Sequence, residues 1–574
     1  MKTYLAITLG PIFKTLIRQR RTRSIFSASY LFSYIMRELM KQLIEQDADC
    51  ANNILTPSAN FLDHDDYRHI GCGIYSDQLI MEGKAGSLET FERARGATIE
   101  HLLEAFGTES LKSRGYLEQY LKIYAIEVEM EPNDQTFKTI KRYLDQVELF
   151  ENFPIGPDED LLQSFFHQKS GHFIFEDAFS PDSANKGERF DTLAEIATRT
   201  FARLDSEEKR KEYSQIIWEE IVRHILKPQT EETEEEVDQF YEKLEQAFPE
   251  EYRDYHKYIA IVNVDGDSFG NYIASFGGSK EQYQTFSDSL FAFVKEANRL
   301  IREYGGTPVY IVGDDMLFFA PVACLNAATD QFETIFHLVN TLDKEFFRHF
   351  PAEKHTPTLS YGISISYHKY PMNEALIESY GLLDQAKNKG VHQERKKHPN
   401  KNAIAFKILK HSGQFFEAVI AKDKPGEDKR DKTVYQHFLG LLDAHITGNS
   451  FINSLTHGMA FFQDILVRLL VEDKDAESVR NLFANNLNEG IHNLNRSFID
   501  AVVEFVIAVF AHQRDLDQKN PKVYQCYDGS LSETDKADKR IEAIGKDGLA
   551  IIYSTLRFIH FIRSSRTQAI SEHA

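Results

Sequence analysis

The clearest hydrophobic pattern in the chain begins at residue 258 and predicts strands and helices in alternation. The run YIAIVNV (258–264) has the continuous apolar character of a buried strand, and Asp265 follows it directly. A long amphipathic helix is predicted next, with Ser279 and Gln282 at the spacing of a capping box. Glycines at 305 and 306 end this helix, and its apolar side chains recur at helical spacing: Phe286, Leu290, Phe293, Ala297, Leu300 and Tyr304.

A hairpin comes after this helix. VYIV (309–312) and MLFFA (316–320) have the pattern of two strands about a turn formed by Gly313, Asp314 and Asp315. The remaining pattern predicts a helix over 326–350, a half-buried strand over 359–367, a helix over 373–389 and a strand over 403–409. The order βαββαβ, with one further helix and strand, is the split-βαβ plan of ferredoxin-like domains.

This topology explains why two carboxylates stand between hydrophobic strands. In the split-βαβ plan the first two strands run parallel and the third lies between them. The end of strand one and the hairpin after strand two therefore lie at the same edge of the sheet. We expect Asp265 to meet Asp314 and Asp315 there.

The N-terminal region repeats the plan faintly. A strand is predicted at 3–9 and a possible hairpin at 69–82, where Asp77 occupies the turn that matches the Gly-Asp-Asp turn. The first strand leads into Gly10 and Pro11 rather than an aspartate, so a three-carboxylate cluster cannot form here. We interpret this region as a degenerate copy whose other elements are a helix at 24–46, a helix at 88–106 and a strand at 121–130.

The elements predict an α+β protein with two ferredoxin-like domains, the first degenerate. Charged, exposed helical sequence between 206 and 250 joins more apolar regions, and the sequence beyond 413 has the length and periodicity of bundle helices. The expected domains are a degenerate first domain (1–150), a helical insertion with an acidic linker (151–250), a second ferredoxin-like domain (251–412) and a C-terminal helical domain (413–574).

Charge limits the nucleic-acid contacts that this chain can make. The 574 residues include 66 Lys and Arg against 88 Asp and Glu, a formal charge of −22, which opposes wrapping nucleic acid over the whole surface. A local cluster remains in KTLIRQRRTR, which could contact RNA phosphates or an acidic partner subunit, or be a solvated basic turn. Its members are Lys14, Arg18, Arg20, Arg21 and Arg23.

Cysteine content and hydropathy indicate a soluble protein of a reducing cytoplasm. The four cysteines are scattered without a CxxC motif, so neither a disulfide framework nor a four-cysteine zinc site is expected: Cys50, Cys72, Cys324 and Cys526. The longest apolar run near the C-terminus, AVVEFVIAVFA (501–511), is far shorter than the roughly 20 residues of a membrane span. No signal peptide or membrane association is expected.

Three carboxylates at one sheet edge predict a chemistry. Like charge and desolvation would suppress the ionisation of Asp265, Asp314 and Asp315 unless a cation balances them. A pair of Mg²⁺ or Mn²⁺ ions fits, because hard divalent cations prefer oxygen ligands and bind a triphosphate at the same time. Two metals about 3.5–4 Å apart would activate a ribose hydroxyl and steady the leaving pyrophosphate, which is nucleotidyl transfer.

The neighbouring residues suggest a nucleotide site. In VDGDSFG the loop of Gly266, Ser268, Phe269 and Gly270 would approach phosphate oxygens closely, and Asp267 is either a further ligand or an exposed turn residue, which we favour. Gly313 allows a tight hairpin or a close nucleotide. Lys387 could bind a triphosphate or be an exposed lysine at a helix end. The chain has no GxxxxGK[ST] loop and no GxGxxG after a strand, so ATPase and Rossmann functions lose their main support.

Together these motifs resemble a known family. VDGDSFG, the Gly-Asp-Asp turn, the helix between them and the later SYGISIS…AK resemble the palm domain of the large polymerase/cyclase subunit of type III CRISPR effector complexes. The type III-B form is the most similar, and nucleotide cyclases of the GGDEF class are more distant. LAITLGPIFKTL, GCGIYSDQLI, FDTLAEIATRTF and NKNAIAFKILKHSG resemble other parts of that subunit.

The resemblance implies a function. In an assembled complex of protein subunits and guide RNA, binding of target RNA would switch on synthesis of a nucleotide second messenger from ATP. Asp265, Asp314 and Asp315 would be the catalytic and metal-binding residues. Members of the family make cyclic oligoadenylates or couple AMP to S-adenosylmethionine. The degenerate first palm would help to hold the acceptor, which makes Asp77 and Glu148 candidate pocket residues, or else plain turn and helix positions.

The sequence departs from the family in three respects. Val312 stands where the family usually has the first glycine of Gly-Gly-Asp-Asp, and the cysteines do not form the family's zinc-finger pattern. The chain begins at the first palm, so we expect no N-terminal HD nuclease. LDHDDYRH contains His64 and Asp65, but the other dispersed metal ligands of that nuclease are missing, so DNA cleavage is not expected.

Two other functions stay open at this point. The chain could be a catalytically silent scaffold that organises guide RNA and partner subunits, or a free-standing cyclase of the GGDEF type. The intact carboxylates oppose the first, and the degenerate domain and large helical C-terminus oppose the second. Neither base preference nor the product follows from these residues.

Overall fold

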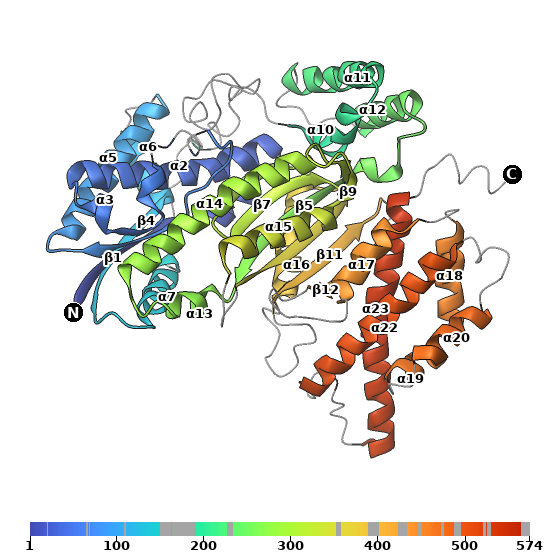
Figure 1. Ribbon diagram of the computed structural model, residues 1–574. Coiled ribbons are helices and arrows are strands. Elements are labelled where there is room, and N and C mark those ends of the chain that lie inside the picture. Colours follow the sequence, from blue (N-terminus) through green and yellow to red (C-terminus); the bar gives the residue numbers. More distant parts are fainter. Residues whose placement is uncertain are drawn as a thin grey trace.

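The structure is a computed structural model, and it describes most of the chain. The described residues are 1–19, 21–62, 64, 67, 69–107, 111–149, 162, 191–226, 234–351, 357–387, 401–411, 413–422, 433–445, 450–471, 476–486, 495–519, 524 and 530–563. Figure 1 shows two α/β units side by side, with helices above them and a separate group of helices at the C-terminal end.

The first sheet domain, the N-terminal α/β unit, contains a four-stranded sheet in the order β2-β3-β1-β4. The central strand β1 is antiparallel to both of its neighbours. The strands are β1 (Lys2–Gly10), β2 (Ile54–Thr56), β3 (Gln78–Gly83) and β4 (Lys122–Met130). The helices are α1 (Ile12–Leu16), α2 (Thr22–Gln46), α3 (Cys50–Asn53), η1 (Ala59–Phe61), α5 (Ser87–Ala105), α6 (Leu111–Tyr120) and α7 (Thr136–Glu148).

The second sheet domain contains a six-stranded sheet in the order β12-β11-β10-β5-β7-β6. Strands β5 and β6 are each antiparallel to β7, so they run parallel with β7 between them, as predicted. The strands are β5 (Tyr258–Asp267), β6 (Thr307–Val312), β7 (Asp315–Pro321), β10 (Thr358–Tyr367), β11 (Ala403–Leu409) and β12 (Phe415–Ala421). The helices are η3 (Asp254–Lys257), α13 (Phe269–Ala274), α14 (Lys280–Tyr304), α15 (Ile335–His349) and α16 (Met372–Ala386).

The two sheets correspond strand by strand. Strands β1, β2, β3 and β4 of the first domain correspond, in chain order, to β5, β6, β7 and β10 of the second. With this correspondence, these four strands have the same order in both sheets. The predicted α+β fold with a repeated ferredoxin-like unit is therefore confirmed. Asp77 directly precedes β3, the position that Asp314 occupies before β7.

Strand β10 is more deeply buried than its alternating pattern predicted. We expected a half-buried strand, but its small polar side chains Ser360, Ser364 and Ser366 are all buried as well. Helix α16 covers these serines, because it packs closely on this part of the sheet. A Cβ at Gly362 would lie only 2.2 Å from the carbonyl oxygen of Ser379 in α16. Alternation of apolar and small residues here reflects close helix packing rather than a solvent-facing side.

The helix predicted over 326–350 is shorter than expected. It begins at Ile335, and the preceding residues form a small hairpin of β8 (Ala323–Leu325) and β9 (Phe332–Thr334). The side chain of Asn326 accepts a hydrogen bond from the backbone N–H of Ala328, and Asp330 has a left-handed φ of 54°. These local bonds favour a turn over a helix, because Asn and Asp compete for backbone groups.

The hairpin predicted over 69–82 is also wrong. Only β3 is a strand in this segment, and it pairs with β2, which lies earlier in the chain, outside the predicted hairpin. The Ser33 hydroxyl accepts hydrogen bonds from the backbone N–H groups of Ile74 and Tyr75, which holds this segment against α2.

At the start of α14, the Ser279 hydroxyl accepts a hydrogen bond from the backbone N–H of Gln282, as predicted. The same hydroxyl also donates to Glu281, and no reciprocal bond from the Gln282 side chain completes the capping box. Strand β12, helix α13 and helix α7 were not predicted.

The helical insertion folds around its own small core. It comprises α10 (Leu193–Ala197), η2 (Arg199–Arg203), α11 (Glu207–Leu226) and α12 (Glu234–Ala247). We expected an exposed linker between 206 and 250, but α11 and α12 enclose buried aromatic and aliphatic side chains that include Phe201, Tyr213, Tyr241, Leu244 and Phe248. Their charged residues cover the outside of this core.

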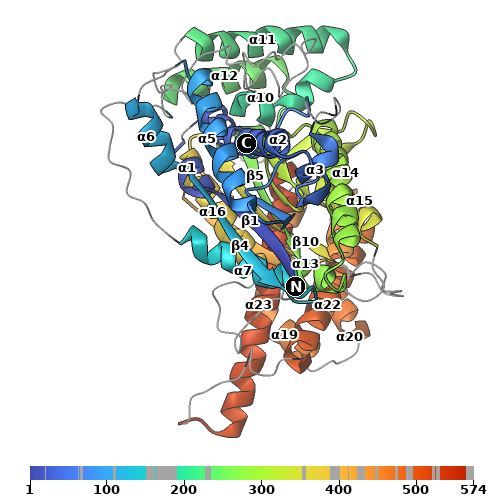
Figure 2. The ribbon, with the colours of Figure 1, turned by 90° about the vertical axis from the view of Figure 1, so that its left-hand side faces the viewer.

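The C-terminal region is helical, as predicted. Its helices are α17 (Val434–Asp443), α18 (Ser450–Phe461), α19 (Gln463–Val471), α20 (Ala476–Asn486), α22 (Arg496–Lys519) and α23 (Glu533–Arg563). Helix α23 reaches β12, where the Ser554 hydroxyl donates to the carbonyl of Glu417 over 2.7 Å. Figure 2 shows this group and the helical insertion at opposite ends of the two sheet domains. None of the described helices has the length and apolar character that crossing a bilayer demands.

Candidate active site

Three aspartates of the second sheet domain lie at one edge of its sheet. Asp265 is near the end of β5, and the turn between β6 and β7 carries Asp314 and Asp315. The antiparallel register pairs Val264 with Met316, so the next step along both strands brings Asp265 beside Asp315. All three residues line one cavity of about 620 Å³.

The absence of a side chain at Gly266 lets the end of β5 approach Asp314 of the turn. A Cβ on Gly266 would lie 2.0 Å from Oδ2 of Asp314 and 2.4 Å from the ring of Phe269. No side chain larger than hydrogen fits without displacing the carboxylate. The glycine that we expected to face a phosphate therefore faces Asp314.

Crowding of like charge marks the aspartates of the turn. Burial, followed by repulsion from Asp265, raises the pKa of Asp314 to about 6. Burial and the charges of Asp265, Asp314 and Asp77 raise the pKa of Asp315 well above its ordinary range. Asp314 is half-buried, and Asp315 is exposed to the cavity that both residues line. The protein around this cavity displaces water from both carboxylates, which disfavours their ionised forms. Among the described residues, no lysine or arginine forms an ion pair with either carboxylate of the turn.

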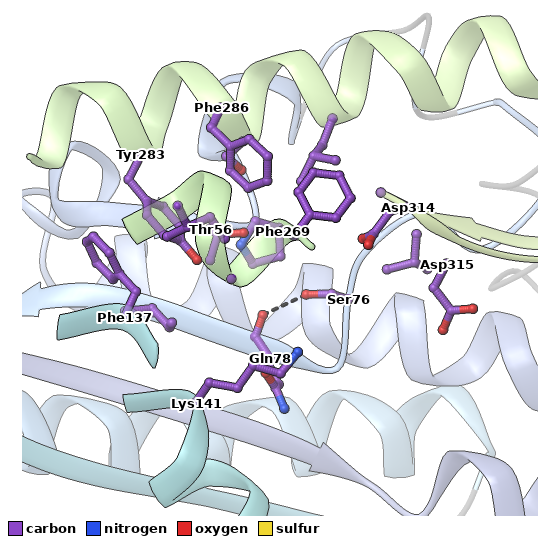
Figure 3. A pocket seen from close by; sticks show the side chains of 18 of the residues that line it. Thr56, Ser76, Gln78, Phe137, Lys141, Phe269, Tyr283, Phe286, Asp314 and Asp315 are labelled. Carbon is purple, nitrogen blue, oxygen red and sulfur yellow. Dashed lines mark hydrogen bonds between the residues drawn. The ribbon is translucent and has the colours of Figure 1, made fainter. Parts of the chain in front are cut away.

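The opposite wall of the cavity comes from the first sheet domain. Helix α7 contributes three cationic residues and the carboxylate of Asp145, Asp134 precedes this helix, and Asp77 and Gln78 come from the start of β3. Figure 3 shows Lys141 and Gln78 across the cavity from Asp314 and Asp315, with aromatic rings gathered at one end. The cationic residues are Lys138, Lys141 and Arg142, and the aromatic ones are Phe137, Phe269, Tyr283, Phe286 and Phe291.

Sequence reasoning missed the cationic face of α7. A usable signal was present after β4, because Phe137, Ile140 and Leu144 are buried at helical spacing. Lys138, Lys141 and Arg142 recur at intervals of three and four on the remaining side of the same helix. What the sequence could not tell is that this side faces the Gly-Asp-Asp turn of another domain.

Lys387 lies elsewhere than predicted. Its ammonium forms an ion pair with Asp265 and donates to the carbonyl of Gly266 over 2.8 Å. The side chain is 4 % exposed and is not among the residues that line the cavity. The alternative of an exposed helix-end lysine is wrong, and the predicted triphosphate contact would require this buried group to move.

Asp267 is buried rather than exposed at a turn. Its Oδ2 accepts hydrogen bonds from three groups: the Thr358 hydroxyl at 3.0 Å, the Ser360 hydroxyl at 2.7 Å and the backbone N–H of Asn402 at 2.8 Å. Its Oδ1 lies 3.7 Å from the ammonium of Lys387. The interpretation as an exposed turn residue is therefore wrong.

The other candidates from the loop and turn have distinct environments. Ser268 has a left-handed φ of 65° and precedes α13, while Phe269 packs edge-on against Phe346 and Phe350. Gly270 lines the cavity, and a Cβ there would meet nothing within 4 Å. Gly313 has a φ of 64°, which suits glycine, so the tight turn by itself accounts for this residue.

The two candidates from the first sheet domain differ. Asp77 lines the cavity, and burial followed by the charge of Glu148 raises its pKa to about 6. Glu148 accepts hydrogen bonds from the Thr8 hydroxyl at 2.6 Å and from the Gln78 amide at 3.1 Å. It is not a lining residue, so it lies behind Gln78 and supports the cavity wall.

Comparison with known proteins gives this arrangement a family. Residues 258–405 match the model of the second palm domain of Cas10/Cmr2. Over these residues the second sheet domain is therefore similar to a Cas10/Cmr2 second palm domain, and we call it the palm below. This palm contains the candidate aspartates, the Gly-Asp-Asp turn and α14 to α16.

Solved structures resemble the chain over most of its length. The apo state of the type III-B Cmr-beta complex contains a chain with a TM-score of 0.55 at 10 % identity, covering 84 % of this chain and 77 % of that one. Cmr-beta bound to cognate target RNA gives 0.49 at 11 %, covering 86 % and 78 %. A Csm1-Csm4 cassette in complex with cA4 gives 0.46 at 11 %, covering 96 % and 70 %. No curated protein matches the sequence.

The palm aspartates suit a divalent cation in chemistry but are not gathered around one point. Burial and like charge raise the pKa values of Asp314 and Asp315, and carboxylate oxygens are the ligands that Mg²⁺ and Mn²⁺ prefer. Across the described part of the chain, no three His, Cys, Asp or Glu side chains form a ready metal-binding group. Asp315 accepts a hydrogen bond from the Tyr310 hydroxyl at 3.3 Å and points away from Asp314 (Figure 3). Binding by all three carboxylates would therefore require Asp315 to turn.

The remaining sequence features lie apart from the palm cavity. In the basic segment, Lys14 and Arg18 are exposed and Arg21 and Arg23 are half-buried, while Arg20 lies outside the described residues. Cys50, Cys72 and Cys324 are buried free thiols, and Cys526 also lies outside the described part. Of the His64 and Asp65 pair, Asp65 lies outside the described residues.

Proposed function

We propose that the chain is the nucleotide-synthesising subunit of a type III CRISPR effector complex. Its second palm would act as a nucleotidyltransferase on ATP, in a complex of partner subunits and guide RNA that is activated by target RNA. The observation that carries this proposal is the cavity between the two sheet domains, where Asp265, Asp314 and Asp315 face the cationic side of α7. The overall likeness to the type III-B Cmr-beta chain supports the assembly.

The two walls of the cavity divide the work of holding a nucleotide. Lys138, Lys141 and Arg142 supply positive charge for a polyphosphate, and arginine adds a planar fork of donors. The rings of Phe137 and Tyr283, whose centroids are 4.0 Å apart, offer an apolar end for a base. A cavity of about 620 Å³ is within the usual range of small-molecule sites.

The aspartates would organise the reacting groups. When bound at Asp265, Asp314 and Asp315, divalent cations would assist the ribose hydroxyl and balance the charge of the departing pyrophosphate. In the transfer, the ribose oxygen forms a bond to the α-phosphorus of ATP while the bond to pyrophosphate breaks. Asp77, opposite the palm turn, is a candidate contact for the acceptor, and Glu148 would hold Gln78 in place.

Two product classes agree with this site. The acceptor would be either a second adenine nucleotide, which leads to a cyclic oligoadenylate, or S-adenosylmethionine, which would receive AMP. Both place an adenosine moiety between the aromatic end and the palm turn. The residues that line the cavity do not distinguish them.

The test is product analysis with the complete complex. Wild-type chain, partner subunits, guide RNA and target RNA are incubated with ATP and Mn²⁺ or Mg²⁺, with and without S-adenosylmethionine, and the products are identified by mass spectrometry. Replacing Asp314 and Asp315 by alanine should reduce synthesis by roughly 100-fold or more while the complex still assembles. The exposed Asp464 on α19, replaced by alanine, is the matched control and should keep full activity.

One observation favours a second candidate, the catalytically silent scaffold. The ion pair of Lys387 with Asp265 already balances one of the three charges, which reduces the need for a cation. If the wild-type complex makes no product with every partner and metal present, the scaffold function is correct. If the Asp314 and Asp315 variants synthesise product at the wild-type rate, the site proposed here is wrong.

A further inference from the structure

The second aspartate of the palm turn is turned toward a tyrosine of the same hairpin. Asp315 points away from Asp314 (Figure 3), and its Oδ1 accepts a hydrogen bond from the Tyr310 hydroxyl at 3.3 Å. Tyr310 pairs with Leu317, so Asp315, two residues earlier on β7, is its diagonal neighbour on the same face of the sheet. The hairpin register itself therefore supplies this donor.

Tyr310 is fixed by contacts on both its backbone and its hydroxyl. Its backbone forms a β-bridge with Gly73 of the first sheet domain, where the N–H of Ile311 donates to the Gly73 carbonyl over 2.9 Å. Its hydroxyl lies 3.4 Å from the hydroxyl of Tyr380 on α16. Because Tyr310 is also buried, its ring cannot follow Asp315 if that carboxylate turns toward Asp314.

The first sheet domain also supports Tyr380. The ring of Phe13 in α1 packs edge-on against the ring of Tyr380, with the centroids 4.7 Å apart and the planes at 86°. Two contacts of the first domain thus reach Tyr310, one through Gly73 and one through Phe13 and Tyr380. The position of the Tyr310 hydroxyl depends on how the two sheet domains are joined.

Charge explains why Asp315 takes this position when no cation is bound. The carboxylates of Asp265, Asp314 and Asp315 repel one another, and turning Asp315 toward a hydroxyl donor relieves part of the repulsion. A divalent cation reverses the preference, because it attracts carboxylate oxygens. The distances of 3.3 and 3.4 Å exceed the usual O–H···O distance of about 2.7–2.8 Å, so the contact is weak enough for a cation to break.

We propose that Tyr310 is a positioning residue that holds Asp315 out of the metal site in the cation-free chain, so that metal binding must first break the hydrogen bond between them. Tyr310 does not line the cavity, so it acts through Asp315 rather than on the nucleotide. The inference deepens the proposed function and rests on it for the nature of the ligand, a divalent cation.

Manganese binding by the full chain tests this without catalysis. Free Mn²⁺ is followed by electron paramagnetic resonance as MnCl₂ is added. The same titration of Asp314→Ala measures binding outside the site, which is expected for a chain with a formal charge of −22. Tyr310→Phe should bind Mn²⁺ at the site about three- to tenfold more tightly than wild type, because the binding-competent position of Asp315 becomes more populated.

Two further variants separate this effect from a general loosening of the hairpin. In a chain that already carries Asp315→Ala, Tyr310→Phe should give no gain in Mn²⁺ affinity, since Tyr310 acts through Asp315. Tyr143→Phe removes the hydroxyl of an exposed tyrosine on α7 and should leave the affinity unchanged. A gain of equal size without the Asp315 carboxylate would refute the proposed contact.

Tyr380→Phe covers the case in which Tyr310→Phe does not fold. It keeps the ring that packs on Phe13 and removes only the hydroxyl beside Tyr310, so the gain in Mn²⁺ affinity should be smaller, about twofold. An affinity equal to or weaker than that of wild type in this variant would then decide against the inference.

Synthesis by the complete complex separates this inference from the proposed function. The Mn²⁺ concentration that gives half-maximal synthesis should fall in Tyr310→Phe by the same factor as the dissociation constant. Equal or weaker Mn²⁺ binding by Tyr310→Phe would overturn the inference even if the wild-type complex makes product. Tighter binding in a complex that makes no product would support the inference and count against the proposed function.

Discussion

At the scale of single residues, the aspartates of the palm turn are held at an energetic cost. Asp314 rests against the bare Cα of Gly266, next to Asp265, and has no lysine or arginine partner among the described residues. Burial and like charge disfavour its ionised form. Such a perturbed carboxylate in a cavity is typical of a functional site rather than of a structural turn.

This cost should appear in the pH dependence of stability. The pKa of Asp314 is raised to about 6 in the folded chain, above the ordinary value of 3.8 that applies when it is unfolded. Between these values the folded state binds more protons, so the free energy of unfolding should fall as pH rises from about 4 to about 6. Above pH 6 the full penalty should be present.

Asp314→Asn should remove the penalty. Without divalent cations the variant should be more stable than wild type at pH 8 by on the order of 1–2 kcal/mol, allowing for the partial exposure of the side chain. Near pH 4 the difference should be much smaller, because Asp314 is then protonated in the folded state and about half protonated in the unfolded state. Urea unfolding followed at both pH values measures this, and a variant less stable than wild type at pH 8 would contradict it.

At the scale of elements, two arginines of η2 fasten the helical insertion to the second palm. Arg203 donates to the carbonyls of Glu303 at 2.8 Å, Tyr304 at 3.0 Å and Leu325 at 2.7 Å, close to the end of α14. Arg199 donates to the carbonyl of Gly305 at 3.0 Å. The last carbonyls of a helix have no partners within the helix, and here the insertion supplies them.

Arg203→Ala should loosen this junction. Several carbonyls would lose a charged donor in a partly buried place, so we expect a loss of about 2–4 kcal/mol in the free energy of unfolding. Hydrogen exchange should rise at the end of α14 and in β8, and thermal unfolding should begin earlier. Lys211→Ala on the exposed side of α11 is the control, since its ion pair with Glu207 contributes little. Equal stability of the two variants would refute the docking role.

At the scale of the whole molecule, the two sheet domains form one unit around the cavity. Helix α14 of the palm lies along β2 of the first sheet domain, where the amide of Gln284 donates to the Ile54 carbonyl over 2.8 Å. Asp288 accepts hydrogen bonds from the Ser58 hydroxyl and from the Asn60 amide. The core of buried side chains is continuous across both domains.

Weakening this contact should affect the cavity, since each domain supplies one wall. Asp288→Ala should cost about 1–2 kcal/mol of stability and raise the KM for ATP severalfold, because the cationic face of α7 would no longer be held at a fixed distance from the palm turn. Arg299→Ala on the same helix, whose ion pairs are exposed and internal to α14, should change neither quantity. An unchanged KM in Asp288→Ala would mean that the two walls act independently.

Local signals in the sequence were sufficient for most of the second palm. Apolar runs, helical spacing and the glycine at 305 predicted β5, α14 and the hairpin of β6 and β7, because each signal acts within a few residues. The same reasoning failed at 326–334, where Asn326 and Asp330 favour a hairpin within a segment of helical composition. The domain boundaries that we expect at residues 150, 250 and 412 remain predictions.

The sequence by itself determined the repeated ferredoxin-like plan, and with it the meeting of Asp265 with the Gly-Asp-Asp turn, because strand order follows from chain connectivity. Only the tertiary structure decided what surrounds them. Lys387 turned inward to Asp267, and the cationic side of α7 came to face the palm turn from another domain. Side-chain partners across such distances in sequence depend on packing and burial, which no local pattern of residues encodes.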